Sequence, residues 1–431
     1  MGLALPTGSS GIIGGNRGSL AGWQSYHSYR TGATAQGGGG WAGSEFARLG
    51  PAKISMAASL GFSLNSNVNN SPDNPLADGI VNASYIIGIN WQATRRNLLQ
   101  LNLGFNFQQY LKYSEYNNNG LLVDPFTGLD YRIYFSDFVL TLYDYPSITN
   151  NGGNNDPAIT NSVNFSQLNN SGGISLIWHP NQLLLMGGFQ RQDTVSLSSN
   201  EFDSQNSTGY SAFGTMAYNF TPTTSVGVRI QASTTTYTQQ ILNDSVTTQA
   251  GIYFQSQITN YTRFYFEFGL QSGTYTNTGR QTSTVVFQET NGLNTNVEGT
   301  LGGGNYMQPY FNLQINNRLN RYLTQAFTFG RSATGSSVAN YQEMYTASYQ
   351  LQYRLNRVTT LSMNANYQLG TISSATSSLP YSNWQGGLAL GFEVVKDTSL
   401  GLSYSYYYNE LSELSDSYSQ QILSFTISHR F

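Results

Sequence analysis

Apolar and polar side chains alternate with a period of two along much of the chain. The final ten residues are ILSFTISHRF, in which Leu423, Phe425, Ile427, His429 and Phe431 share one face of an extended strand. The intervening serine, threonine and arginine side chains occupy the other face, because successive side chains of a strand point to opposite sides. The segment therefore has one mainly apolar face and one polar face.

The same alternation recurs in other parts of the chain and predicts further strands. Clear examples are KISMAASLGFSLN at 53–65, LLQLNLGFNFQ at 98–108, RFYFEFGLQ at 263–271 and SLGLSYSYYYN at 399–409. No segment shows a sustained helical period. The predicted strands run for about 12 to 15 residues, whereas strands of soluble proteins usually have about 5 or 6.

Short turns separate the predicted strands at one end and longer polar segments separate them at the other. The longer segments are rich in glycine and asparagine, as at 66–79, 196–207 and 279–303. The short turns are predicted at 94–97, 179–182, 221–224, 259–262, 316–321, 356–359 and 396–399. Short periplasmic turns opposite longer extracellular loops are typical of outer-membrane β-barrels.

The spacing of the turns predicts the number of strands. Successive turns lie mostly about 40 residues apart, one hairpin each, but the gap between 94–97 and 179–182 is about twice as long. A turn at Ser136–Asp137 divides this gap and gives about 18 strands. Without it, residues 113–168 form one long loop and the count is about 16. We favour the larger count.

The composition favours a membrane-spanning barrel over a soluble antiparallel protein. Charged residues make up 10% of the chain, against roughly 25% in ordinary globular domains. Mean hydropathy is nevertheless negative, at −0.32, because uncharged polar residues are abundant. A closed barrel pairs every backbone group within the protein, as hydrocarbon requires. The sequence therefore predicts an all-β, antiparallel, up-and-down transmembrane barrel in the bacterial outer membrane, surrounded by lipid and lipopolysaccharide.

Several other classes of function are disfavoured. The net charge of −3 argues against nucleic acid as a partner. The absence of cysteine excludes disulfides and thiolate chemistry. The three histidines are His27, in a glycine-rich segment, His179, in a short turn, and His429, on the apolar face of the last strand. None is well placed as a catalytic base, so we expect no enzyme, metal or cofactor.

Two regions are predicted. Residues 1–50 include GGNRGSLAG and AQGGGGWAG, lack strand alternation and are predicted to be a flexible segment that forms a periplasmic tail or a lumen plug. The first residues also lack the basic start and apolar core of a signal peptide. Residues 51–431 are predicted to form the barrel.

The C-terminal segment resembles the insertion signal of bacterial outer-membrane proteins, in which alternating apolar residues end in phenylalanine. The resemblance covers Leu423, Phe425, Ile427 and Phe431, and it implies recognition by the barrel-assembly machinery. FSLNSNVNN at 62–70 and FVLTLYDYPSI at 138–148 resemble segments of β-barrel porins (porin 2-like) found with exopolysaccharide gene clusters. That resemblance could extend over 51–431 and implies an outer-membrane barrel of about 18 strands.

The polar face of the strands predicts the character of the pore. About 16 to 18 strands leave a water-filled interior. Charged residues on this face have both signs, whereas selective ion pores carry rings of one sign. We expect a porin for passive, weakly selective diffusion of small polar solutes, with neutral sugars as plausible substrates. The candidate pore-lining charges are Lys53, Arg229, Arg263, Glu267, Arg354, Glu393 and Arg430.

Two alternatives use the same barrel. One is an export channel for an exopolysaccharide, which follows from the family resemblance and an uncharged, tyrosine-bearing lumen. The other is a structural or adhesive surface barrel with asparagine- and glycine-rich loops. The sequence leaves open the solute, the direction of transport, a homo-oligomeric state, and whether loops at 113–128 and 149–168 narrow the pore.

Overall fold

The structure, a computed structural model, consists almost entirely of β-strands. It describes residues 46–117, 121–150, 166–197, 206–239, 242–276, 283–288, 294–299, 304–336, 340–373, 378–411 and 417–431. Within these ranges the one helical element is the single 3-10 turn η1 (Ser114–Tyr116). No helix among them has the length and apolar character needed to cross a bilayer.

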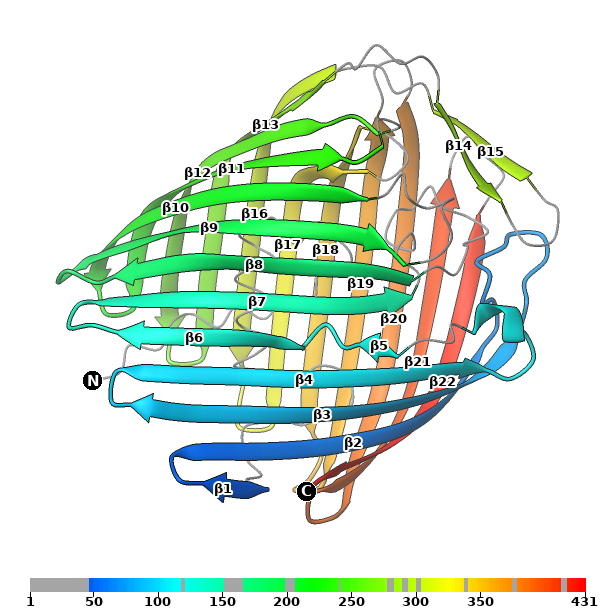
Figure 1. Cartoon of the computed structure of the whole chain (residues 1–431), viewed down its shortest axis with the longest axis horizontal. Coiled ribbons are helices and arrows are strands. Elements are labelled where there is room, and N and C mark those ends of the chain that lie inside the picture. Colours follow the sequence, from blue (N-terminus) through cyan, green and yellow to red (C-terminus); the bar gives the residue numbers. More distant parts are fainter. Residues whose placement is uncertain are drawn as a thin grey trace.

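Eighteen strands form one antiparallel wall, and each pairs with its neighbours along the chain (Figure 1). The strands are β2 (Ala52–Asn65), β3 (Asp78–Thr94), β4 (Asn97–Tyr110), β6 (Gly128–Tyr134), β7 (Phe138–Asn150), β8 (Ser166–Trp178), β9 (Leu183–Ser196), β10 (Ser207–Thr221), β11 (Thr224–Tyr237), β12 (Ser245–Thr259), β13 (Thr262–Tyr275), β16 (Gly304–Arg318), β17 (Leu323–Gly335), β18 (Tyr341–Arg354), β19 (Thr359–Ser373), β20 (Ser378–Val395), β21 (Thr398–Leu411) and β22 (Tyr418–Arg430).

The first and last strands of the wall pair with each other and close the barrel. The register of β2 with β22 runs from Ala57 opposite Arg430 to Asn65 opposite Ile422. The predicted turn at Ser136–Asp137 lies between β6 and β7. The all-β barrel and the larger strand count are therefore confirmed.

Four short strands lie outside the regular up-and-down pattern. β1 (Ala47–Leu49) pairs with the start of β2, so the described end of the predicted tail joins the sheet. Residues 1–45 of that tail lie outside the described ranges. β14 (Ser283–Gln288) and β15 (Asn294–Gly299) form a separate hairpin within the predicted loop at 279–303.

The fourth short strand shows that the predicted loop at 113–128 partly joins the wall. β5 (Leu122–Val123) pairs with β4 and β7, on the long-loop side of the short β6. Between β5 and β6 the chain bulges at Asp124–Thr127, where the Thr127 hydroxyl accepts a hydrogen bond of 2.9 Å from the Gly104 backbone N–H. The predicted loop at 149–168 lies mostly outside the described ranges.

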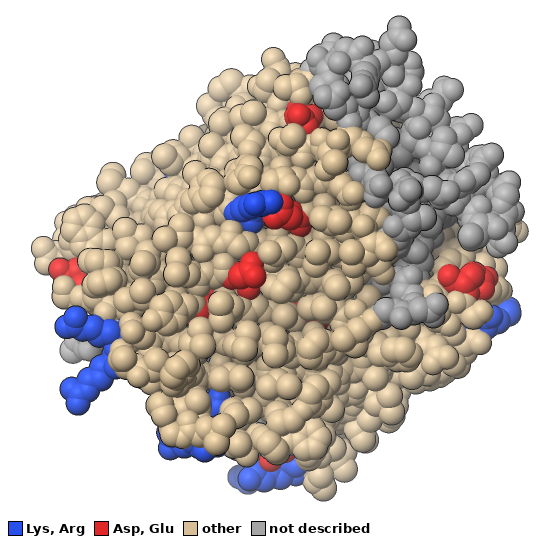
Figure 2. All heavy atoms as spheres, viewed as in Figure 1, with Lys and Arg blue, Asp and Glu red and all other residues tan. Residues whose placement is uncertain are grey.

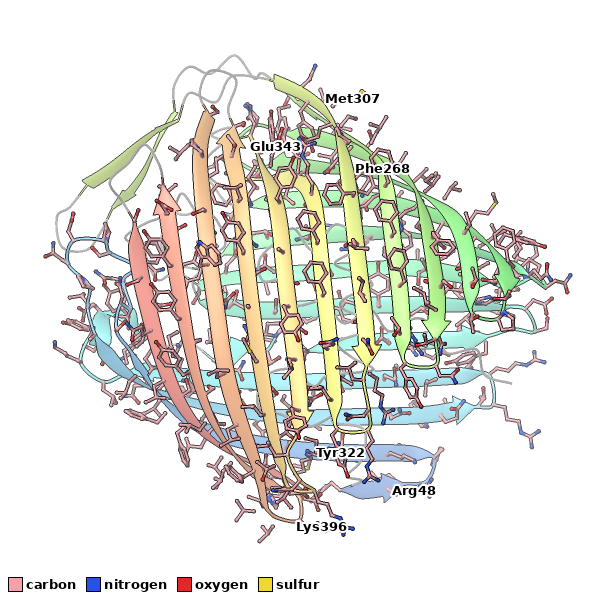
Figure 3. All side chains as sticks on the ribbon, turned by 180° about the vertical axis from the view of Figure 1, so that it is seen from behind. Arg48, Phe268, Met307, Tyr322, Glu343 and Lys396 are labelled. Atoms are coloured by element: carbon pink, nitrogen blue, oxygen red, sulfur yellow. The ribbon has the colours of Figure 1, made fainter. Side chains whose placement is uncertain are left out.

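The two faces of the wall differ in chemistry, as the alternation predicts. On β11, Val226, Val228 and Ile230 are exposed, whereas Ser225 and Arg229, at alternate positions, are buried. Figure 3 shows that Phe268 and Met307 project from the outside of the barrel. The exposed apolar side chains thus form the outer surface, and the alternate positions face the lumen.

Charged side chains are sparse on the outer surface. Figure 2 shows a face that is almost entirely uncharged, with lysine and arginine gathered along one edge. Arg48 and Lys396 lie at the end of the barrel that carries the short turns (Figure 3). One ion pair stands in the outward register of β9, where Arg191 lies 2.9 Å from Asp193.

Candidate functional site in the barrel lumen

A buried ion pair lies on the lumen face of three neighbouring strands. Arg229 of β11 and Glu267 of β13 approach to 2.8 Å, with 5% and 3% of their side chains exposed. The Tyr310 hydroxyl donates to the other carboxylate oxygen of Glu267 at 2.8 Å, and the Tyr265 hydroxyl also donates to this carboxylate. The arginine stacks on Tyr253 of β12, 5.5 Å from the ring centre. We call these five residues the ion-pair cluster.

Two glycines make room for this cluster. Gly251 pairs with Arg229 on one side and with Gly269 on the other, and Gly269 pairs with Tyr310. A methyl group at either glycine would overlap the Tyr310 side chain. The Tyr310 side chain can therefore lie over these glycines and reach Glu267. Glu267 stands on β13, two strands away from Arg229 on β11.

One step toward the long-loop end, glutamines occupy the same register on four neighbouring strands. Gln231 pairs with Gln249, Gln249 with Gln271, and Gln271 with Gln308. Each stands at a lumen-facing position of its strand. We call these four residues the glutamine row. It forms a band of uncharged donors and acceptors directly beside the ion-pair cluster.

Above the glutamine row, β17 leaves the wall and turns into the lumen. The pairing of β16 with β17 ends where Phe311 lies opposite Arg331. Beyond that point the Gln271 side chain pairs with the β17 backbone where β16 no longer does. Its amide donates to the Ala333 carbonyl at 2.5 Å and accepts from the Ala333 N–H at 3.0 Å. Tyr341 of β18 follows and packs 4.5 Å from the ring of Tyr306.

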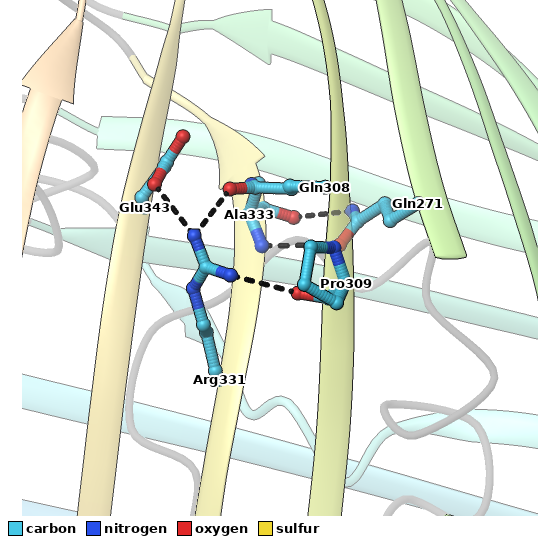
Figure 4. Close-up of polar contacts among 6 residues, drawn as sticks. All are labelled: Gln271, Gln308, Pro309, Arg331, Ala333 and Glu343. Carbon is cyan, nitrogen blue, oxygen red and sulfur yellow. Dashed lines mark hydrogen bonds and ion pairs between the residues drawn. The ribbon is translucent and has the colours of Figure 1, made fainter. Parts of the chain in front are cut away.

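Arg331 contacts both neighbouring strands, β16 and β18, at the point where β17 leaves the wall (Figure 4). Its guanidinium lies 3.2 Å from Glu343 of β18 and donates to the Gln308 side chain at 3.0 Å. It also donates to the carbonyl of Pro309 at 3.2 Å. Proline has no backbone N–H, so this position of β16 could not supply a ladder donor to β17.

A polar pocket lies between the wall and the inturned end of β17. Its enclosed volume is about 90 Å³, and it is open on one side. Every described residue that lines it is uncharged, and its lining includes Gln231, Gln249, Tyr306 and Thr334.

The predicted pore-lining charges fall into two groups. Arg229 and Glu267 come together in the ion-pair cluster. The others all lie near the short-turn ends of their strands: Lys53, Arg263, Arg354 and Glu393 are exposed, and Arg430 is partly buried. That these residues line the pore stays a prediction, and alternation gave no indication of the depth of each residue in the barrel. Among the described residues, no group of three histidine, aspartate or glutamate side chains could hold a metal ion.

The residues of the predicted insertion signal lie on the outer face of β22. Leu423, Phe425 and Ile427 are 41–49% exposed, and Phe431 is 48% exposed just after the strand. The Phe431 backbone N–H donates to the carbonyl of Met56 at 3.0 Å, and the Phe431 ring packs edge-on against His429 with 4.7 Å between ring centres.

Deletion of Phe431 is expected to reduce the folded fraction in the outer membrane several-fold. The terminal aromatic group is the part of the segment that resembles the signal read by the barrel-assembly machinery. The measurement is the heat-modifiable band in outer-membrane fractions. Phe431→Tyr, which keeps an aromatic end, is the control, and normal assembly of the deletion variant would contradict the prediction.

Sequence alternation did not reveal the glutamine row or the inturned end of β17. Each glutamine stands at a lumen-facing position of its own strand, which alternation does show. Their alignment depends on the register between strands, which the pairing of whole strands sets. Pro309 was the one local indication that β16 loses a partner.

The barrel is similar to solved outer-membrane porins. A BenF-like porin from Pseudomonas fluorescens Pf-5 matches with a TM-score of 0.52 at 10% identity, over 88% of this chain and 98% of that chain. The outer membrane protein OpdK from Pseudomonas aeruginosa matches with a TM-score of 0.48 at 11% identity, over 88% of this chain and 99% of that chain. No family model and no curated protein matches the chain.

The first of these likenesses shows the fold. The chain has the architecture of an outer-membrane porin. Together with the exposed apolar outer surface, this architecture places the protein in the bacterial outer membrane. The narrower resemblance to porins of exopolysaccharide gene clusters stays a prediction.

Proposed function

We propose that the protein is a porin through which small, mostly uncharged polar solutes diffuse passively. The observation that carries this proposal is the chemistry of the lumen face. Glutamine, serine, threonine and tyrosine dominate the pocket, and the buried charges Arg229 and Glu267 beside it neutralise each other. A barrel of about 18 strands is wide enough for an aqueous channel.

The same features support weak ion selectivity. A complete ring of one sign would select strongly for counter-ions, whereas the remaining predicted lumen charges near the short turns are four cations and the carboxylate Glu393, which favour a mild preference for anions. The pocket beside the inturned end of β17 is lined by amide and hydroxyl groups. Such a surface exchanges hydrogen bonds with hydrated neutral solutes at little desolvation cost.

The purified protein is expected to produce discrete conductance steps in planar bilayers. In a KCl gradient, the reversal potential should be small and should have the sign of a preference for Cl⁻, because four of the five predicted lumen charges near the short turns are cations. A barrel that passes neither ions nor small sugars in bilayers and liposomes contradicts the proposal. If the barrel instead exports a polysaccharide, deletion of the gene should remove the surface polymer.

A further inference from the structure

We infer that the pocket beneath the inturned end of β17 is a binding site for a neutral polyhydroxylated solute, a mono- or oligosaccharide. The inference rests on the proposed porin function and assigns a solute class to one place in the channel. It is carried by the juxtaposition of three members of the glutamine row, Gln231, Gln249 and Gln271, with Tyr306 and Thr334 around one pocket.

The chemistry of the lining favours sugars over ionic solutes. Every described lining residue is uncharged, so neither a carboxylate nor an ammonium group would find a partner of opposite charge. A glutamine side chain offers an acceptor oxygen and two donor hydrogens. Adjacent hydroxyls of a sugar both donate and accept, and they can therefore match one amide with two hydrogen bonds.

The aromatic wall supports the same class of ligand. Tyr306 lies over Gly273, where a methyl group would overlap its ring, and Tyr341 holds it from the other side at 4.5 Å between ring centres. The ring is thus fixed in position where it lines the pocket. Sugars present patches of C–H groups, and an aromatic ring beside polar groups suits such an amphipathic ligand.

One polar atom of the pocket lining has no partner in the described structure. The hydroxyl of Thr334, which is one of the lining residues, is buried without a hydrogen bond. Buried polar groups nearly always have a partner, so this atom indicates a position where a polar ligand or water completes the hydrogen bonding.

The inturned end of β17 makes the pocket possible. If β17 continued beside β16 to its last residue, Ala333–Gly335 would belong to the wall and the glutamine row would face an open lumen. Gln271 holds this end inward through both hydrogen bonds to Ala333. The Gln271 side chain therefore has a structural role, and Gln249 and Thr334 are the better choices for testing binding.

The test is sugar-induced interruption of the single-channel K⁺ current. Maltose should interrupt the current with a saturable dependence on concentration, whereas glutamate should not. Gln249→Leu and Thr334→Val should each weaken the apparent maltose affinity by roughly threefold to tenfold, the loss of one or two hydrogen bonds. The matched control is Gln255→Leu, which removes a lumen-facing glutamine of the same strand outside the pocket and should leave the affinity unchanged.

The folding of the variants separates binding from structure. Thr334→Val removes a hydroxyl that has no partner, so its free energy of unfolding should not fall below that of the unmodified protein. An open channel whose current maltose does not interrupt overturns the inference, and so does an affinity for maltose that is unchanged from the unmodified protein in both pocket variants.

Failure of the porin function can be distinguished from failure of the site. If the barrel conducts no ions, calorimetric titration of the detergent-solubilised protein with maltose replaces the current measurement. Saturable binding that Gln249→Leu weakens would then support the site while the porin function fails. Absence of binding in that titration overturns the inference.

Discussion

Replacement of Glu267 with alanine is expected to lower the free energy of unfolding by about 3–5 kcal/mol, because it leaves a buried charge without a partner. Arg229 would remain with 5% of its side chain exposed and no carboxylate nearby, while Tyr265 and Tyr310 would lose their common acceptor. The measurement is a urea titration of the refolded protein in lipid vesicles, followed by tryptophan fluorescence.

A double variant is the control for this effect. Replacing Arg229 and Glu267 together with leucine removes both charges and should recover most of the lost stability, since an apolar pair of similar size often substitutes well for a buried ion pair. A loss below about 1 kcal/mol for the alanine variant would show that water screens the cluster as it screens an exposed pair.

Ile252→Arg is expected to destabilise the barrel by about 2–4 kcal/mol, the cost of an arginine facing lipid near the middle of the bilayer. Ile252 lies at the centre of β12, is 61% exposed, and pairs with the outward-facing Val228 and Phe268. The same urea titration in vesicles measures the change.

The matched control places the same charge on the other face of the same strand. Gln255 lies three residues further along β12, between Ser225 and Tyr265 on the lumen side. Gln255→Arg should change the free energy of unfolding by much less, because the new guanidinium remains in water. Equal losses for the two variants would refute the assignment of an outer lipid face and an inner aqueous face.

The sequence predicts the wall of the barrel well because the wall follows local rules. Alternation identifies each strand, and the spacing of turns reveals even the turn at Ser136–Asp137, which has no glycine or proline. The interruption between β5 and β6 escapes these rules. It depends on Gly104 of the neighbouring strand, whose missing side chain leaves room for the Asp124–Thr127 bulge.

The candidate site was harder to predict because it depends on contacts between distant segments. Arg229 and Glu267 were each predicted to face the lumen, but their pairing requires Gly251 between them and Tyr310 from a strand more than 40 residues away. Gln271 reaches Ala333 across β16, a contact between residues 62 apart in the sequence. No local pattern encodes which side chain takes the place of a missing strand.

The pairing of β2 with β22 has a consequence for biogenesis. These strands are separated by more than 350 residues, so the ring can be completed only after the whole chain has been synthesised and exported. Until then the nascent sheet has two open edges that can recruit other chains. We therefore expect periplasmic chaperones to bind the unfinished polypeptide until the barrel closes. C-terminal truncations are expected to aggregate in the periplasm rather than insert as smaller barrels.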